Sequence, residues 1–165
     1  MKLPVIFALV LVAALTAACR QPDGSLPPLD EQDTNRISDL AHDLQAIAGG
    51  DASAHKDFAQ DLVVFVDPHA PEAQATVLDF AGQLAAVVAS AKLTEQSAQQ
   101  LAHSTWSVVG ATEMSDRQIR AMQEELRTQL SANGVAQERV DAVVAEVPTV
   151  QRAVTTRPRR WFEVL

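Results

Sequence analysis

The sequence predicts an all-α protein, either an antiparallel helical bundle or a stack of αα-hairpins, with about six helices. Apolar residues recur at spacings of three and four over most of the chain, and caps, glycines and prolines separate these stretches. Hydrophobic residues make up 47% of the sequence but aromatic residues only 4%. A core of Ala, Val and Leu suits closely packed helices, and short turns between amphipathic helices favour antiparallel neighbours.

Three helices are expected in the first half of the domain. The first has Asp33 or Thr34 as its cap and stops at Gly49-Gly50. Ser53 is expected to cap the second helix. The run 62–66 is rich in β-branched and aromatic residues, so a short strand is the alternative there. Prolines then break the chain before a third helix begins.

The third helix is expected to start near Pro71, because proline suits the first helical turn. Thr94 caps the fourth helix, and residues 115–118 read Ser-Asp-Arg-Gln, a capping box for the fifth. Asn133-Gly134 ends the fifth helix, and the sixth runs up to Pro148. The residues expected to face the core are Ile37, Leu40, Ala41, Leu44, Ile47, Ala48, Phe58, Leu62, Phe65, Val77, Phe80, Ala81, Leu84, Val87, Val88, Ala91, Leu101, Thr105, Trp106, Val109, Ile119, Met122, Leu126, Leu130, Val140, Val143, Val144 and Val147.

The first 18 residues have the pattern of an export signal. Lys2 gives a positive start, residues 3–15 are almost wholly apolar, and small residues follow. The apolar run is shorter than the ~20 residues that a transmembrane helix needs. The pattern therefore predicts a secretory signal peptide.

The segment Leu15-Thr16-Ala17-Ala18-Cys19 resembles the lipobox of bacterial lipoprotein precursors, with Thr16 in the place of the commonest leucine. The resemblance implies cleavage before Cys19, lipidation of its sulfur and amine, and anchoring in a membrane. Several acyl chains hold a protein firmly where one holds it reversibly. In lipoproteins of double-membraned bacteria, a residue such as Arg20 in place of Asp favours the outer membrane, so we expect an anchor there that faces the periplasm.

The chain thus divides into four expected parts. Residues 1–18 are the signal, and residues 19–32 are the lipidated cysteine and a flexible tether with three prolines and a glycine. Residues 33–150 form the helical domain, and residues 151–165 form a basic and aromatic tail.

Charge and cysteine usage exclude several functions. The formal net charge of −8 argues against general nucleic-acid binding. Cys19 is the only cysteine, which excludes an intramolecular disulfide and a cysteine-based zinc site. No cofactor and no nucleic-acid partner are expected.

The remaining polar residues match no catalytic or metal motif. The four histidines, His42, His55, His69 and His103, do not follow a zinc-binding spacing, although Asp51 lies four residues before His55 and Asp67 lies two before His69. No serine lies in a Gly-x-Ser-x-Gly or Ser-x-x-Lys frame, and the sequence has no phosphate-binding glycine loop. The sequence therefore favours a non-enzymatic protein, with a hydrolase as the third hypothesis.

The C-terminal tail combines charge with aromatic surface. Arg157, Arg159, Arg160, Trp161 and Phe162 are candidates for contact with anionic lipid, glycan or an acidic protein surface. The alternative is that the tail docks on its own acidic domain and that Trp161 fills a groove there, because a large apolar pair is costly to leave in water.

The leading functional hypothesis is a membrane-anchored lipoprotein whose periplasmic helical domain binds an envelope protein partner or serves in envelope assembly. Residues 93–96, Leu-Thr-Glu-Gln, and 114–118, Met-Ser-Asp-Arg-Gln, resemble the Leu-Thr-x-x-Gln motifs of small helical periplasmic stress chaperones related to Spy. That resemblance implies the alternative, a chaperone-like or metal-responsive stress protein.

The anchor can be tested directly with Cys19→Ser. We expect the wild-type chain to begin at residue 19 and to carry acyl chains, and the variant to carry none and to leave the outer-membrane fraction, since the thiol is the acylated group. Intact-mass spectrometry and membrane fractionation measure both. A variant that stays bound to that membrane contradicts the prediction.

Overall fold

The computed structural model describes residues 30–111 and 113–155, and every regular element in these ranges is helical. The helices are α1 (Glu31–Ala48), α2 (Ala54–Val63), α3 (Pro71–Val88), α4 (Glu95–Gly110), α5 (Asp116–Ala132) and α6 (Gln137–Thr155). The all-α class and the number of helices are confirmed for this part of the chain. The six predicted site residues lie outside the described residues: Cys19, Arg157, Arg159, Arg160, Trp161 and Phe162.

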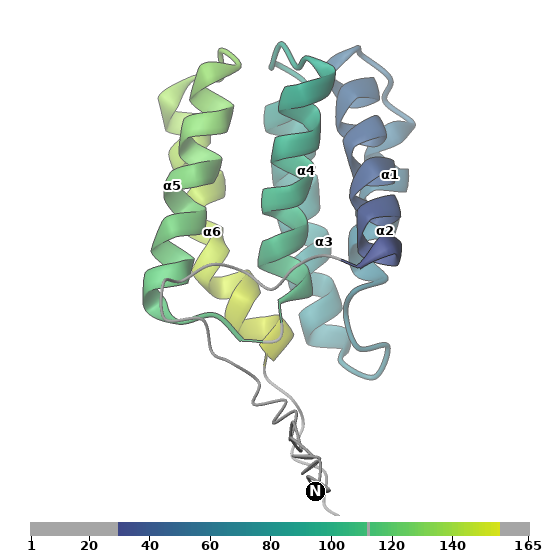
Figure 1. Ribbon diagram of the computed structural model, residues 1–165, viewed down its shortest axis with the longest axis vertical. Coiled ribbons are helices and arrows are strands. Elements are labelled where there is room, and N and C mark those ends of the chain that lie inside the picture. The colour runs from purple at the N-terminus through teal and green to yellow at the C-terminus, as the bar shows by residue number, and fades with distance from the viewer. Residues whose placement is uncertain (1–29, 112, 156–165) are drawn as a thin grey trace, which may run out of the picture.

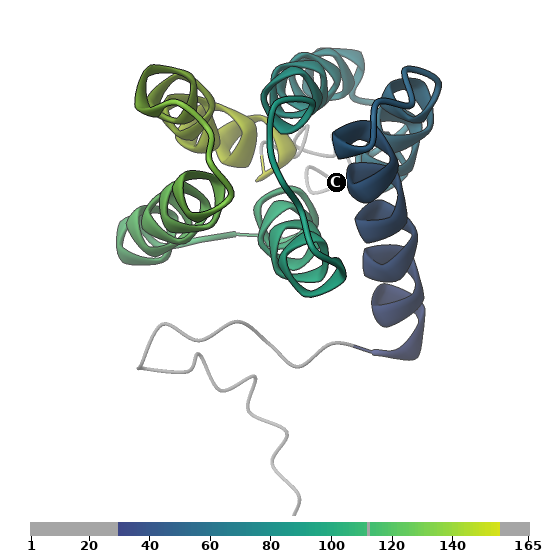
Figure 2. The ribbon, with the colours of Figure 1, turned by 90° about the horizontal axis from the view of Figure 1, so that it is seen from above.

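The helices form two layers of three. Figure 1 shows that α1, α3 and α5 run in one direction and α2, α4 and α6 in the other, so neighbours along the chain are antiparallel. Seen from above, α1, α4 and α5 form the front layer and α2, α3 and α6 the back layer (Figure 2). Within the front layer α4 packs between α1 and α5, and it also contacts α6 behind it.

One hydrophobic cluster, to which all six helices contribute side chains, holds the layers together. Most of its members were expected from the three-and-four spacing of the sequence. Phe58 and Phe80 are its largest fully buried side chains, with leucines and valines around them. Each such side chain contributes about 1.5–3 kcal/mol through burial. Phe65, Trp106 and two α5 positions, Ile119 and Met122, are only partly buried.

The caps that were predicted for the second half of the domain are present. Thr94 accepts a hydrogen bond from the Ser97 backbone N–H, and Ser115 accepts one from the Gln118 backbone N–H; both helices carry complete capping boxes. The chain leaves α5 through Gly134 at φ +84°, where a glycine avoids the strain that a side chain would cause.

The start of α1 and the end of α2 differ from the prediction. The carboxylate of Asp30 accepts from the Asp33 backbone N–H at 2.8 Å, so α1 begins at Glu31, and the last two residues assigned to the tether are helical. The strand alternative for residues 62–66 is wrong. Leu62 and Val63 end α2, and the backbone N–H groups of Phe65 and Val66 donate to carbonyls three residues earlier, so residues 64–66 form a turn.

The sixth helix continues through Pro148, where the sequence predicted its end. Proline has no N–H to donate to the carbonyl of Val144 one turn earlier, a loss that normally breaks a helix. The side-chain Nε2 of Gln123, from α5, donates to that carbonyl at 3.0 Å and replaces the missing bond. Residues 151–155, assigned to the tail by the sequence, therefore belong to α6.

Gln151, in the last turns of α6, fastens the connection between α4 and α5. Its side chain is 2% exposed. Its Nε2 donates to the carbonyls of Val108 at 3.1 Å and Ala111 at 3.3 Å, and its Oε1 accepts from the Met114 N–H at 3.3 Å. One amide thus satisfies a carbonyl in the last turn of α4 and two backbone groups of the connection that follows it.

Replacement of this amide should be costly. Gln151→Leu leaves buried backbone groups without partners, and we expect it to lower the free energy of unfolding by about 2–3 kcal/mol. Gln45→Leu, at an exposed position of α1, is the matched control and should change it by less than about 0.5 kcal/mol. Urea denaturation measures both, and equal effects would refute this role of Gln151.

Candidate functional site

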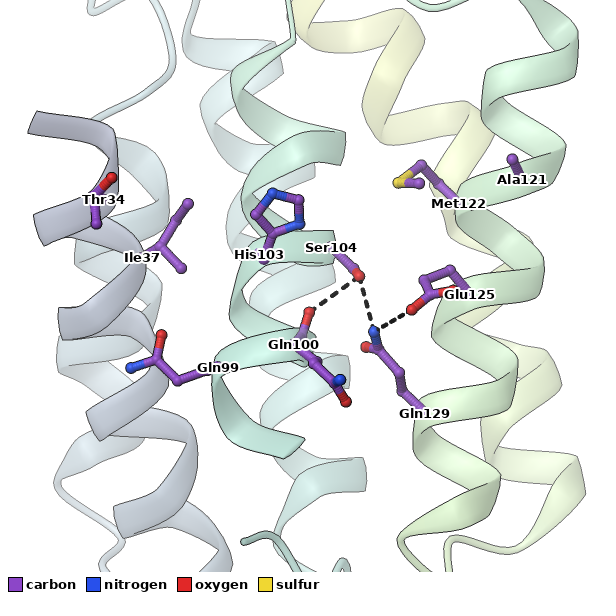
Figure 3. Close-up of a pocket in the computed structure, with 10 residues that line it drawn as sticks. All are labelled: Thr34, Ile37, Gln99, Gln100, His103, Ser104, Ala121, Met122, Glu125 and Gln129. Atoms are coloured by element: carbon purple, nitrogen blue, oxygen red, sulfur yellow. Dashed lines mark hydrogen bonds between the residues drawn. The ribbon is translucent and has the colours of Figure 1, made fainter. Parts of the chain in front are cut away.

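A groove on the outer face of the front layer is the best candidate for a binding site. It has a volume of about 580 Å³ and is lined by residues from α1, α4 and α5 (Figure 3). Ligand sites commonly enclose about 300–1,000 Å³. The helix α4 forms its floor, while α1 contributes Thr34 and Ile37 to one wall and α5 contributes Met122, Glu125 and Gln129 to the other.

Gln129 is the central polar group of the groove. Its side chain is 8% exposed, and its Nε2 donates to Ser104 Oγ at 3.1 Å and to Glu125 Oε1 at 2.6 Å. The carboxylate fixes the orientation of the amide, because only the NH₂ end can donate to it. The Oε1 atom of Gln129 is buried and has no hydrogen-bond partner. A ligand that donates to this oxygen would offset a penalty of about 1–3 kcal/mol.

The groove presents hydrogen-bond acceptors and negative charge. Glu125 is an exposed residue of the α5 wall, and none of the 10 lining residues is Lys or Arg. The ion pairs found among the described residues both use Arg127, which contacts Glu124 at 2.9 Å and Asp141 at 3.3 Å. The carboxylate of Glu125 belongs to neither pair; one of its oxygens accepts from Gln129 Nε2, and the other is left for a ligand.

Helical spacing explains how the sequence assembles this wall. Met122, Glu125 and Gln129 are three and four residues apart on α5 and therefore share one face. Leu126 and Leu130, on the neighbouring stripe, are fully buried in the core. Sequence reasoning singled out neither Glu125 nor Gln129 as a site residue; the one available signal was an amide at the edge of the apolar stripe.

An aromatic cluster lies beside the groove at the lower half of α4. The rings of Phe65 and Trp106 meet edge to face at 6.3 Å, and the Arg36 guanidinium lies 5.1 Å from the centre of the Phe65 ring. A side chain at Gly110 would come within 3.1 Å of the Trp106 ring, so this glycine provides the space that Trp106 occupies. The cluster fixes the α2–α3 connection against α4.

A second cavity, of about 410 Å³, lies between the start of α5 and the end of α6. Met114, Ile119 and Pro148 supply its apolar surface. Gln151 also lines it, but both ends of that amide are already bonded to the backbone. None of the buried, unpartnered side-chain atoms found in the described ranges belongs to a residue of this cavity. The groove is therefore the stronger candidate.

Within the described ranges, the histidines and the carboxylates near them in sequence do not gather into a metal site. No group of three or more His, Cys, Asp or Glu side chains within residues 30–111 and 113–155 could hold a metal ion. Asp51 accepts hydrogen bonds from the N–H and hydroxyl of Ser53, and Asp67 accepts one from the His69 N–H at 2.8 Å. These carboxylates stabilise turns. His103 lies at the groove instead.

Carboxylates crowd together between α1 and α2. Loss of water around Asp43, followed by the negative charges of Asp61 and Asp57, raises the pKa of Asp43 to about 6. One oxygen of Asp43 is buried and unpartnered. Desolvation likewise raises the pKa of Asp61. The crowding makes this side of the bundle sensitive to pH.

Comparisons with known proteins give no relative. No protein-family profile matches the chain, and neither the curated proteins nor the solved structures contain a match. Within the described ranges, none of the helices combines the length and apolar character needed to cross a bilayer.

The Asp43 carboxyl predicts a pH-dependent stability. Its pKa rises from an ordinary 3.8 to about 6 on folding, so between these values the folded chain binds more protons, and stability falls as pH rises. Asp43→Asn removes this contribution and should stabilise the domain at pH 7.5 by about 1 kcal/mol, after allowance for solvent screening, with less effect near pH 4.

Thermal unfolding at a series of pH values measures this effect. Asp79→Asn, at an exposed position of α3, is the matched control for loss of one negative charge. The same pH profile for wild type and Asp43→Asn would contradict the prediction.

Proposed function

We propose that this chain is a lipid-anchored protein of the bacterial cell envelope and that its helical domain binds another envelope protein through the α1–α4–α5 groove. The observation that carries the binding role is the buried, unpartnered Oε1 atom of Gln129 in that groove. Native proteins pair most of their buried polar atoms, so such an atom in an open groove is typical of a site that a ligand completes.

The composition of the groove supports a specific binding site. Ile37 and Met122 provide apolar surface, while Gln99, Gln100 and Glu125 provide polar groups around it. Apolar walls with a few placed polar groups are typical of binding pockets. All three helices that form it are also fixed by the core, so the groove exists before a partner arrives.

The proposed location of the binding domain, in the cell envelope, is supported by the N-terminal sequence. Residues 1–18 and Cys19 support export and lipidation, and Arg20 supports an outer-membrane anchor that faces the periplasm. The ten residues between Cys19 and Asp30 can span at most about 35 Å. The domain would then meet its partner close to the membrane surface.

The chaperone alternative has less support from the described surface. A chaperone of that type needs a continuous apolar surface for unfolded chains. The large apolar side chains that stand exposed in the described ranges are Val64, just after α2, and Leu78, on α3, and neither lines the groove. A groove rich in amides favours a defined partner.

A photo-crosslinking amino acid at His103 tests the proposal. His103 is exposed and lines the groove, so in intact cells we expect it to form one discrete covalent adduct with an envelope protein. The same amino acid at Gln83, an exposed position of α3 in the back layer, should give no such adduct. Gel mobility and mass spectrometry read the result, and adducts from both positions or from neither would refute the groove as the interface.

A further inference from the structure

We propose that the groove recognises an arginine side chain of the partner polypeptide, whose guanidinium bridges the Glu125 carboxylate and the Oε1 atom of Gln129. This inference rests on the proposed binding function and adds the chemistry of the contact. It follows from which atoms of the groove are already bonded, which are not, and what charge surrounds them.

The two acceptors are neighbours and need donors. The Nε2 atom of Gln129 donates to Glu125 Oε1 at 2.6 Å, so the amide and the carboxylate lie side by side on α5 (Figure 3). The second carboxylate oxygen of Glu125 and the Oε1 atom of Gln129 are then left as acceptors. A ligand that completes both must supply at least two N–H or O–H groups a short distance apart.

A guanidinium meets this requirement better than other common groups. Its planar fork carries five N–H donors, so one N–H group can pair with the free Glu125 oxygen while another donates to Gln129 Oε1. An ammonium is a point charge without this fork, and an anion would be repelled by Glu125. A neutral amide can donate to Gln129 Oε1 but leaves the carboxylate without a counter-charge.

The apolar part of the groove suits the stem of the same side chain. Met122 lies three residues before Glu125 on the same wall and offers apolar surface to the three methylene groups. Arginine often buries its stem along such surface while its head reaches polar groups. No Lys or Arg lines the groove, and the chain as a whole is acidic, so a cationic segment meets no repulsion there.

The test uses the full chain in detergent and three labelled probe peptides. The first is acetyl-Ala-Leu-Arg-Leu-Ala-amide; the second has citrulline, a neutral isostere that keeps N–H donors, in place of arginine; the third has glutamate. Fluorescence anisotropy measures their dissociation constants. We expect the arginine peptide to bind at least tenfold more tightly than the citrulline peptide and the glutamate peptide not to bind.

Variants then separate the two acceptors. Glu125→Gln, at an exposed position that should leave folding intact, is expected to weaken the arginine peptide about tenfold and to remove the preference over citrulline. Gln129→Met should weaken both peptides, because it removes the shared acceptor. Glu124→Gln, which removes the same charge from the adjacent residue outside the groove, is the matched control and should bind within twofold of wild type.

Three results would overturn the inference. They are equal binding of the arginine and citrulline peptides, no binding of the arginine peptide, and equal losses from Glu125→Gln and Glu124→Gln. A fourth concerns the arginines of the chain's own tail. If truncation after Thr156 tightens peptide binding tenfold, the groove belongs to the tail in this chain and not to a partner.

The outcome is separable from that of the proposed function. If His103 gives a specific crosslink but the peptides show no arginine preference, the groove remains the interface and the arginine contact is rejected. If the peptides bind in an arginine-dependent manner but no crosslink to an envelope protein forms, the arginine contact is supported and the proposed envelope partner is rejected.

Discussion

The architecture depends on hydroxyl side chains that α4 can bury inside the bundle. Ser104, Thr105 and Ser107 are at most 3% exposed, and each hydroxyl donates to the carbonyl four residues earlier, at 3.1, 2.8 and 2.8 Å. These bonds offset the cost of removing the hydroxyls from water. Because the side chains are also small, α4 can lie close to α1, α5 and α6 at once, which a helix of leucines could not do without widening the bundle.

One of these small side chains, Ser104, also shapes the groove. Ser104 is short enough for Gln129 to reach across from α5 and donate to its hydroxyl, so the amide lies beneath the surface instead of in solvent. A larger residue at position 104 would push that amide outward and fill the floor. The binding surface therefore depends on how α4 satisfies its own polar groups, and a substitution at Ser104 would alter the packing of α4 and the candidate site together.

Sequence reasoning predicted most of the helices because periodicity and caps are local properties. The capping residues Thr94 and Ser115 act as predicted, and so does the stop at Gly134. The prediction was wrong at Pro148, where local chemistry indicates an end. The helix continues there because Gln123 on α5 bonds to the carbonyl that proline cannot reach, and a bond between helices leaves no trace in local sequence.

The groove could not be predicted from the sequence, because it also depends on contacts between helices. Only Gln129 left a local signal. Gln129 lies on the edge of an apolar stripe, where a leucine would pack against the core without an unpaired oxygen. Gln129 is therefore expected to make the folded domain less stable than a leucine would. Local pattern and fold normally agree in a protein, and exceptions are typical of functional sites. An acceptor left unpaired in the isolated protein also gives discrimination. A partner with a donor removes an existing penalty, whereas a partner of the same shape without one leaves that penalty in place.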